Sequence, residues 1–103
     1  MISLLAFSMV AAAQMPAAPQ RQQLASCLRS FVNSKLEERM APADFEQAIA
    51  AACQQQETTF RTAYIAAATR AGDRRPAAER DAGLEVQDLR TNYLELFRGS
   101  QPE

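Results

Sequence analysis

Residues 24–64 read LASCLRSFVNSKLEERMAPADFEQAIAAACQQQETTFRTAY, and this stretch decides the fold. Apolar residues recur at three- and four-residue steps on both sides of Ala41-Pro42, a spacing that is typical of amphipathic helices. Proline is accepted in the first turn of a helix but disfavoured inside one. The stretch therefore predicts two helices that meet near Ala41-Pro42, with Cys27 on the first and Cys53 on the second.

The two cysteines are placed to meet across such a pair of helices. Cys27 lies about 14 residues before the turn and Cys53 about 12 residues after it. Because an α-helix rises about 1.5 Å per residue, antiparallel packing brings both thiols to nearly the same height. We expect a Cys27–Cys53 disulfide, worth about 3.5 kcal/mol if it acts by restricting the unfolded chain. The alternative is two reduced cysteines that pack as small hydrophobic residues.

The composition favours one all-α domain. The chain has 103 residues, of which 21 are alanine and only 3 are glycine. Alanine is the strongest helix former and a poor strand former. Because alanine side chains bury little surface, the core is expected to be thin, and a disulfide would help to stabilise it. We predict a single helical domain over residues 20–99.

Two of the expected helices lie in the deciding stretch and its flanks. Large apolar residues recur every four positions from Leu24 to Met40, which predicts a helix over 20–40. Its apolar surface is broad enough to contact two neighbours. A second stripe begins at Phe45 and has Cys53 in its middle, which predicts one continuous helix over 42–71. Gly72 would end that helix.

The third expected helix follows residues 72–75, with Asp73 as its N-cap and Pro76 in its first turn. Gly99 would end it, and residues 100–103 are expected to fray. Its apolar stripe consists of Ala82, Val86, Leu89, Tyr93, Leu96 and Phe97. The predicted fold class is all-α: a disulfide-stapled antiparallel helical hairpin plus a third helix, as a three-helix bundle or an open arrangement.

The first 13 residues read MISLLAFSMVAAA, an uncharged apolar run that ends in small residues. This pattern predicts a secretory signal peptide cleaved after Ala13, although it has no Lys or Arg in its n-region. The alternative is an apolar N-terminal helix packed on the domain. Residues 14–19, with two prolines, are expected to form a disordered leader. A periplasmic or secreted location would permit the disulfide.

The residue inventory argues against several functions. The chain has two cysteines and no histidine, so it lacks the usual ligands of zinc and the base of a Ser–His or Cys–His pair. No glycine-rich phosphate loop is present. With a net charge of −1 and acids and bases interspersed, no strong attraction to nucleic acid is implied. We expect no enzyme activity, no cofactor, no metal and no membrane span in the mature chain.

A loose basic cluster surrounds the second connection. Arg70, Arg74 and Arg75 could contact an anionic group. The favoured interpretation is different: Arg70 complements the C-terminus of a helix, and the other arginines are solvated near acidic neighbours.

Several apolar residues are candidates for a surface that binds a partner. Ile65, Leu84 and Leu94 lie off the main stripes, where they would face solvent or another chain. Tyr93 and Phe97 could extend that surface, although a place in the core is the favoured interpretation for both. An apolar stripe on a loosely packed third helix would be the first surface that a partner meets.

The function predicted from these features is protein binding by a small secreted or periplasmic helical protein, with chaperone-like activity as the first hypothesis. In architecture alone it is similar to the small helical chaperones of the bacterial periplasm, but no motif assigns it to a family. The alternative is a dedicated subunit, an inhibitor or a structural homo-oligomer with one specific partner. The partner is not identified by the sequence.

Overall fold

The computed structural model describes residues 16–101, which form four α-helices: α1 (Ala18–Glu37), α2 (Pro42–Ala51), α3 (Gln54–Arg70) and α4 (Arg75–Gly99). No strand occurs in this part of the chain, so the all-α class is confirmed. The expected signal peptide over 1–13, the first two residues of the expected leader and the last two residues of the chain lie outside the described range.

Helix α1 begins and ends earlier than the sequence pattern predicts. It starts at Ala18 with Pro19 in its first turn, a position where the missing N–H is not needed. It stops at Glu37 because Arg39 adopts the left-handed conformation, with φ 56°. The N–H of Met40 then donates to the carbonyl of Lys35 at 3.1 Å, and this bond closes the helix end. Arg39 takes the left-handed position that glycine usually occupies at such an end.

The prediction of one continuous helix over 42–71 is wrong. Helix α2 ends at Ala51, Ala52 is extended, and Cys53 is left-handed with φ 62° and ψ 36°. Neither glycine nor proline marks this break, and the apolar spacing continues across it. Groups from α1 and α4 hold this break.

The connection between α3 and α4 follows the prediction more closely. Gly72 ends α3 with φ 107°, and the N–H of Asp73 donates to the carbonyl of Ala68 at 3.0 Å. Pro76 lies in the first turn of α4 as expected, but the N-cap is Arg74 and its side chain makes no capping bond. The prediction of Asp73 as N-cap is therefore wrong by one residue.

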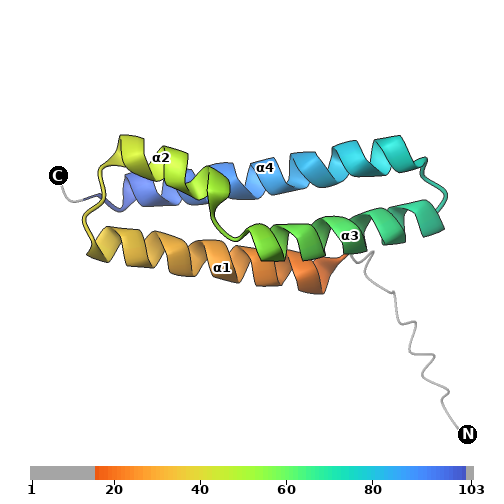
Figure 1. Ribbon diagram of the computed structural model, residues 1–103, viewed down its shortest axis with the longest axis horizontal. Helices are drawn as coiled ribbons and strands as arrows, with labels where there is room; N and C mark the ends of the chain where they lie inside the picture. Colours follow the sequence, from red (N-terminus) through yellow and green to blue (C-terminus); the bar gives the residue numbers. More distant parts are fainter. Residues whose placement is uncertain (1–15, 102–103) are drawn as a thin grey trace, which may run out of the picture.

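Helix α4 is the longest element and contacts each of the other three helices (Figure 1). Helices α2 and α3 follow one another along it, and α1 lies against both α3 and α4. The broad apolar surface predicted for the first helix is thus covered by two neighbours. The core contains residues of all four helices: Leu24, Leu28, Val32, Phe45, Ile49, Phe60, Val86, Leu89 and Phe97.

Two residues of the expected α4 stripe differ in burial from one another. Phe97 is fully buried and stacks on Phe45, with ring centroids 3.8 Å apart. Leu96 was expected to face the core but is 45 % exposed. Adjacent helical positions are separated by about 100°, so one helix face cannot bury both against the same neighbour.

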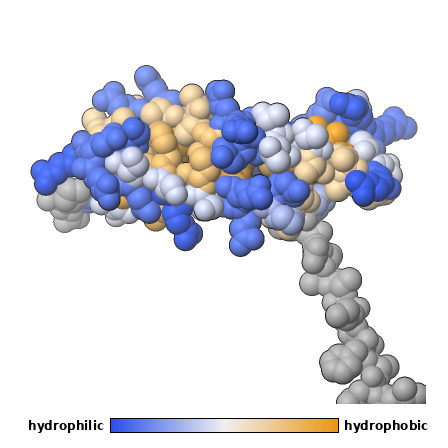
Figure 2. Space-filling model, turned by 60° about the horizontal axis from the view of Figure 1, so that its bottom comes forward, coloured by the Kyte–Doolittle hydropathy of each residue, from blue (hydrophilic) through white to orange (hydrophobic). Residues whose placement is uncertain are grey.

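The outer surface is mostly hydrophilic. Figure 2 shows charged and polar side chains over most of one face, with apolar side chains gathered mainly in the half that contains α2 and the C-terminal part of α1. Among the helices formed by residues 16–101, none combines the length and apolar character that crossing a bilayer requires.

Candidate functional site

The predicted disulfide is present. Cys27 on α1 and Cys53 are joined, with their Cα atoms 6.1 Å apart. Cys53 is not inside a helix, however, but immediately precedes α3. The predicted height of Cys53 remains valid because the helix is interrupted only at Ala52 and Cys53, after the full rise of α2. The disulfide therefore ties the α2–α3 junction to α1.

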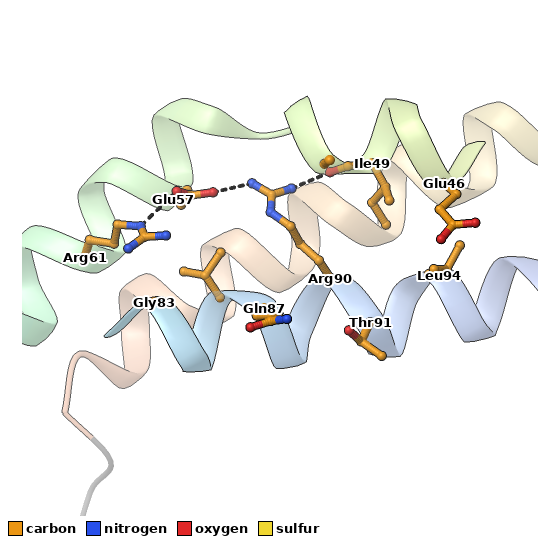
Figure 3. Close-up of a pocket in the computed structure, with 11 residues that line it drawn as sticks. Glu46, Ile49, Glu57, Arg61, Gly83, Gln87, Arg90, Thr91 and Leu94 are labelled. Atoms are coloured by element: carbon orange, nitrogen blue, oxygen red, sulfur yellow. Dashed lines mark hydrogen bonds and ion pairs between the residues drawn. The ribbon is translucent and has the colours of Figure 1, made fainter. Parts of the chain in front are cut away.

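Arg90, on α4, holds the same junction. Its guanidinium donates from Nη1 to the carbonyl oxygen of Ile49 (Figure 3). The same Nη1 donates to the carbonyl oxygen of Ala52 at 2.7 Å. These carbonyls lie at the C-terminal end of α2, where continuing helix would otherwise supply N–H donors. Only 12 % of the Arg90 side chain is exposed. The carbonyl of Ile49 also accepts from the N–H of Ala52 at 3.3 Å, so a side chain from a distant helix supplies the remaining donors at this helix end.

Glu57, in the first turn of α3, completes this cluster. Its Oε1 accepts from Nη2 of Arg90, and its Oε2 accepts from Nε of Arg61 at 2.8 Å. Burial alone would raise the pKa of Glu57, but the hydrogen bonds from Arg90 and Arg61 and the charges of these two groups outweigh burial and lower the pKa. The carboxylate is therefore held ionised between two guanidinium groups and is a weak proton acceptor.

Arg61 lies across α4 at Gly83. A Cβ atom built on Gly83 would be 3.3 Å from Nη1 of Arg61, closer than side chains usually pack. The absence of a side chain at this position lets the guanidinium approach the backbone of α4. Glycine inside a helix is unfavourable by propensity alone. Gly83 has a structural role in α4 because it makes room for the guanidinium of Arg61.

These residues border a groove where the α2–α3 junction meets α4 (Figure 3). Its volume is about 520 Å³, within the usual range of ligand pockets. Apolar side chains and charged groups both line it: Glu46, Ile49, Ala50, Glu57, Arg61, Gly83, Val86, Gln87, Arg90, Thr91 and Leu94. At the far end, Glu46 is paired with Arg98 at 3.0 Å. The groove suits a ligand that carries both an apolar group and a charge.

The apolar residues singled out from the sequence do not form one surface. Leu94 lines the groove, and Ile65 borders a separate hollow on α3 beside Arg75. Leu84 lies on α4 with 52 % of its surface exposed. Tyr93 is half-buried against the core. Phe97 is fully buried, so its proposed place on a binding surface is corrected to the core.

The predicted anion contacts lie away from the groove. Arg70, Arg74 and Arg75 are all exposed around the α3–α4 connection. Nε of Arg75 is bonded to Glu79 on its own helix at 3.0 Å. Exposed pairs of this kind contribute little to stability.

The cluster of Glu57, Arg61 and Arg90 was missed by sequence reasoning. Two signals were available. The first is that Arg90 lies four residues after Val86 and next to Leu89, beside the apolar stripe of α4. A charged residue at the edge of a core face usually needs a partner. The spacing of Glu57 and Arg61 also fits a helical ion pair. Their meeting with Arg90 depends on the tertiary fold.

Within residues 16–101, no three acidic, cysteine or histidine side chains are grouped closely enough to hold a metal ion. Comparisons with protein-family models, with curated proteins and with solved structures find no match to this chain.

Proposed function

We propose that this protein binds a segment of another protein in the groove between the α2–α3 junction and α4, in the periplasm or outside the cell. One observation carries the proposal: the groove lies beside a junction that is anchored by the disulfide to α1 and by Arg90 to α4. A binding site anchored at two points loses little conformational freedom when a ligand enters.

The chemistry of the anchor supports the proposed location. The Cys27–Cys53 disulfide joins residues 26 positions apart and contributes to stability only where it stays oxidised. The apolar run over 1–13 supplies a route of export. A fusion of residues 1–19 to a reporter that is active only after export checks this point. A reporter that remains inactive inside the cell contradicts the proposed location.

Site-specific photocrosslinking tests the binding site. Thr91 and Gln87 are exposed and line the groove, so a photoreactive amino acid at either position should capture the partner in the native cell. Ser30 and Asn33, exposed on α1 and outside the groove, are the matched controls. Equal capture from both pairs, or none from the groove, would overturn the proposal. Many captured proteins would indicate chaperone-like binding, and one dominant protein a dedicated subunit or inhibitor.

A structural homo-oligomer is the second candidate. It is favoured by Leu84, a large apolar residue with 52 % of its surface exposed on α4. Replacement of Leu84 by Glu should leave the folded protein intact, since the side chain is outside the core, but should dissociate an oligomer built on this face. Sedimentation velocity of the wild type and Leu84→Glu distinguishes the two candidates. A wild-type monomer eliminates the oligomer.

A further inference from the structure

The groove wall formed by α2 and α3 is held at the junction between these two helices. Ala50 lies on this wall before the junction and Glu57 after it, so the conformation at Cys53 sets their relative positions. The disulfide ties the junction to α1, and Arg90 ties it to α4. The first anchor is a covalent bond, and the second consists of hydrogen bonds and an ion pair. Only the first anchor can be removed by a reductant.

The disulfide is accessible in the folded protein. Cys27 and Cys53 are each half-buried, and neither belongs to the fully buried core. Ser26, before Cys27, and Gln54, after Cys53, are exposed. A thiolate has to reach a disulfide sulfur in order to attack it, so access decides whether exchange requires unfolding. Partial exposure of both cysteines favours exchange in the folded state.

The junction keeps its second anchor when the disulfide is reduced. Arg90 still donates to the carbonyls at the end of α2 and to Glu57 at the start of α3. The buried cluster, which draws Phe45 and Ile49 from α2, includes large apolar side chains of all four helices. Reduction therefore leaves a folded protein whose junction is attached at one point instead of two. The oxidised and reduced states differ in how firmly one wall of the groove is fixed.

We propose that the Cys27–Cys53 disulfide is a redox switch for the groove: the oxidised protein holds its partner, and reduction by a dithiol protein releases it. A thiolate of the dithiol attacks one sulfur and forms a mixed disulfide, while the other sulfur leaves as a thiolate. The second thiol of the reductant then displaces the first sulfur. Two electrons and two protons thus pass to the cysteines, and the reductant becomes a disulfide. This inference rests on the proposed protein-binding function and adds its regulation.

Release follows from the loss of preorganisation. Helix α1 packs against both α3 and α4, so the disulfide fixes the junction to a helix that also contacts the opposite wall of the groove. Without this link the α2–α3 wall moves, and the binding-competent arrangement is present for only part of the time. If that fraction is about one tenth, the apparent affinity falls about tenfold.

The first test is reduction of the folded protein. The disulfide-bonded protein is treated with dithiothreitol without denaturant, and its free thiols are blocked and counted by mass spectrometry. We expect two blocked thiols and an unchanged helical circular dichroism signal. NMR relaxation dispersion should show new μs–ms exchange centred on residues 49–57. No blocked thiols, loss of the helical signal, or the same backbone dynamics in both states would each overturn the inference.

The second test is photocrosslinking from Thr91 in the native cell. The wild type is compared with Cys27→Ser/Cys53→Ser, which lacks the disulfide. For equal amounts of protein, capture of the partner should be about tenfold lower from the serine variant. Dithiothreitol should lower capture by the wild type to the same level and leave the variant unchanged. Gly72→Ala, which is expected to be less stable but keeps the disulfide away from this change, should capture as the wild type does.

The outcomes separate the switch from the binding function. Equal capture by the wild type and the serine variant would overturn the switch and leave the proposed function in place. Equally reduced capture by Gly72→Ala would attribute the effect to stability and would also overturn the switch. Absence of any capture from Thr91 in the oxidised wild type would remove the proposed function, and the switch with it.

Discussion

Arg90 donates a hydrogen bond of 2.7 Å to the backbone carbonyl of Ala52, so that a side chain of α4 closes the C-terminal end of α2. The same guanidinium bonds Glu57 at the start of α3. One residue therefore stabilises both sides of the helix break. Cys53 lies between these two contacts and is fixed to α1 by the disulfide. The break is a defined structural junction, and the groove is built around it.

Replacement of Arg90 by Gln should lower the free energy of unfolding by about 2–3 kcal/mol, because two carbonyls and Glu57 lose a largely buried partner. Urea unfolding monitored by circular dichroism measures the loss. Amide hydrogen exchange should also accelerate over residues 49–57. The control is Arg98→Gln, whose pair with Glu46 is about half exposed and should change stability by less than about 0.5 kcal/mol. Similar losses in the two variants would contradict the role of Arg90.

Removal of the disulfide in Cys27→Ala/Cys53→Ala should lower stability by about 3–4 kcal/mol. A second double variant, Cys27→Ala/Cys53→Gly, reports whether the break survives. Glycine adopts the φ of 62° found at Cys53 without the cost of about 1 kcal/mol that other residues incur. We expect the glycine variant to be the more stable, because Arg90 still holds the junction. If the alanine variant is the more stable, α2 and α3 have joined into one helix, where alanine is preferred.

The stability of the protein should fall in acid partly through Glu57. Its pKa is lowered in the folded state, so its contribution is complete above the ordinary pKa of about 4.3 and is lost as the pH falls through the folded pKa. Glu57→Gln should be about 1–2 kcal/mol less stable than the wild type at pH 7. The difference should shrink below about pH 4. Urea unfolding between pH 7 and pH 3 measures it, and a constant difference would refute the linkage. Glu37→Gln, an exposed carboxylate, controls for net charge.

Two glycines should respond in opposite directions to alanine. Gly83→Ala should raise stability by up to about 1 kcal/mol through helix propensity, while the tip of Arg61 moves by a few tenths of an ångström. Gly72→Ala should lower stability by about 1 kcal/mol, because φ is 107° there. Thermal unfolding of both variants provides the comparison. A destabilised Gly83→Ala would mean that Arg61 is less free to move than its exposure indicates.

Phe97 should behave as a core residue and Leu96 as a surface residue. Phe97→Leu removes the ring that stacks on Phe45 and should cost about 1–3 kcal/mol. Leu96→Ala, at 45 % exposure, should change stability by less than about 0.5 kcal/mol. Chemical denaturation of both proteins gives the two values. Comparable losses would indicate that Leu96 is covered by another molecule in solution.

Local patterns in the sequence were sufficient for much of the fold. The abundance of alanine predicted the all-α class, and the three- and four-residue spacing placed buried residues such as Leu28 and Phe60 on the correct faces. Gly72 marked the end of α3 because a left-handed residue was required there. The disulfide was predictable because helix rise depends only on residue number. All of these features except the disulfide, which spans 26 positions, are set within a few turns of chain.

The tertiary structure alone decided the break at Ala52 and Cys53, and with it the groove. Apolar periodicity continues across the break, so no residue next to it predicts from the sequence that the helix ends there. The donors that end α2 come from Arg90, 41 positions from Ile49, and the disulfide reaches back 26 positions to α1. A helix end is stable wherever its carbonyls find donors, whether these are near in sequence or not. The sequence therefore determined which residues form helices and which faces they bury, and long-range hydrogen bonds determined where one helix became two.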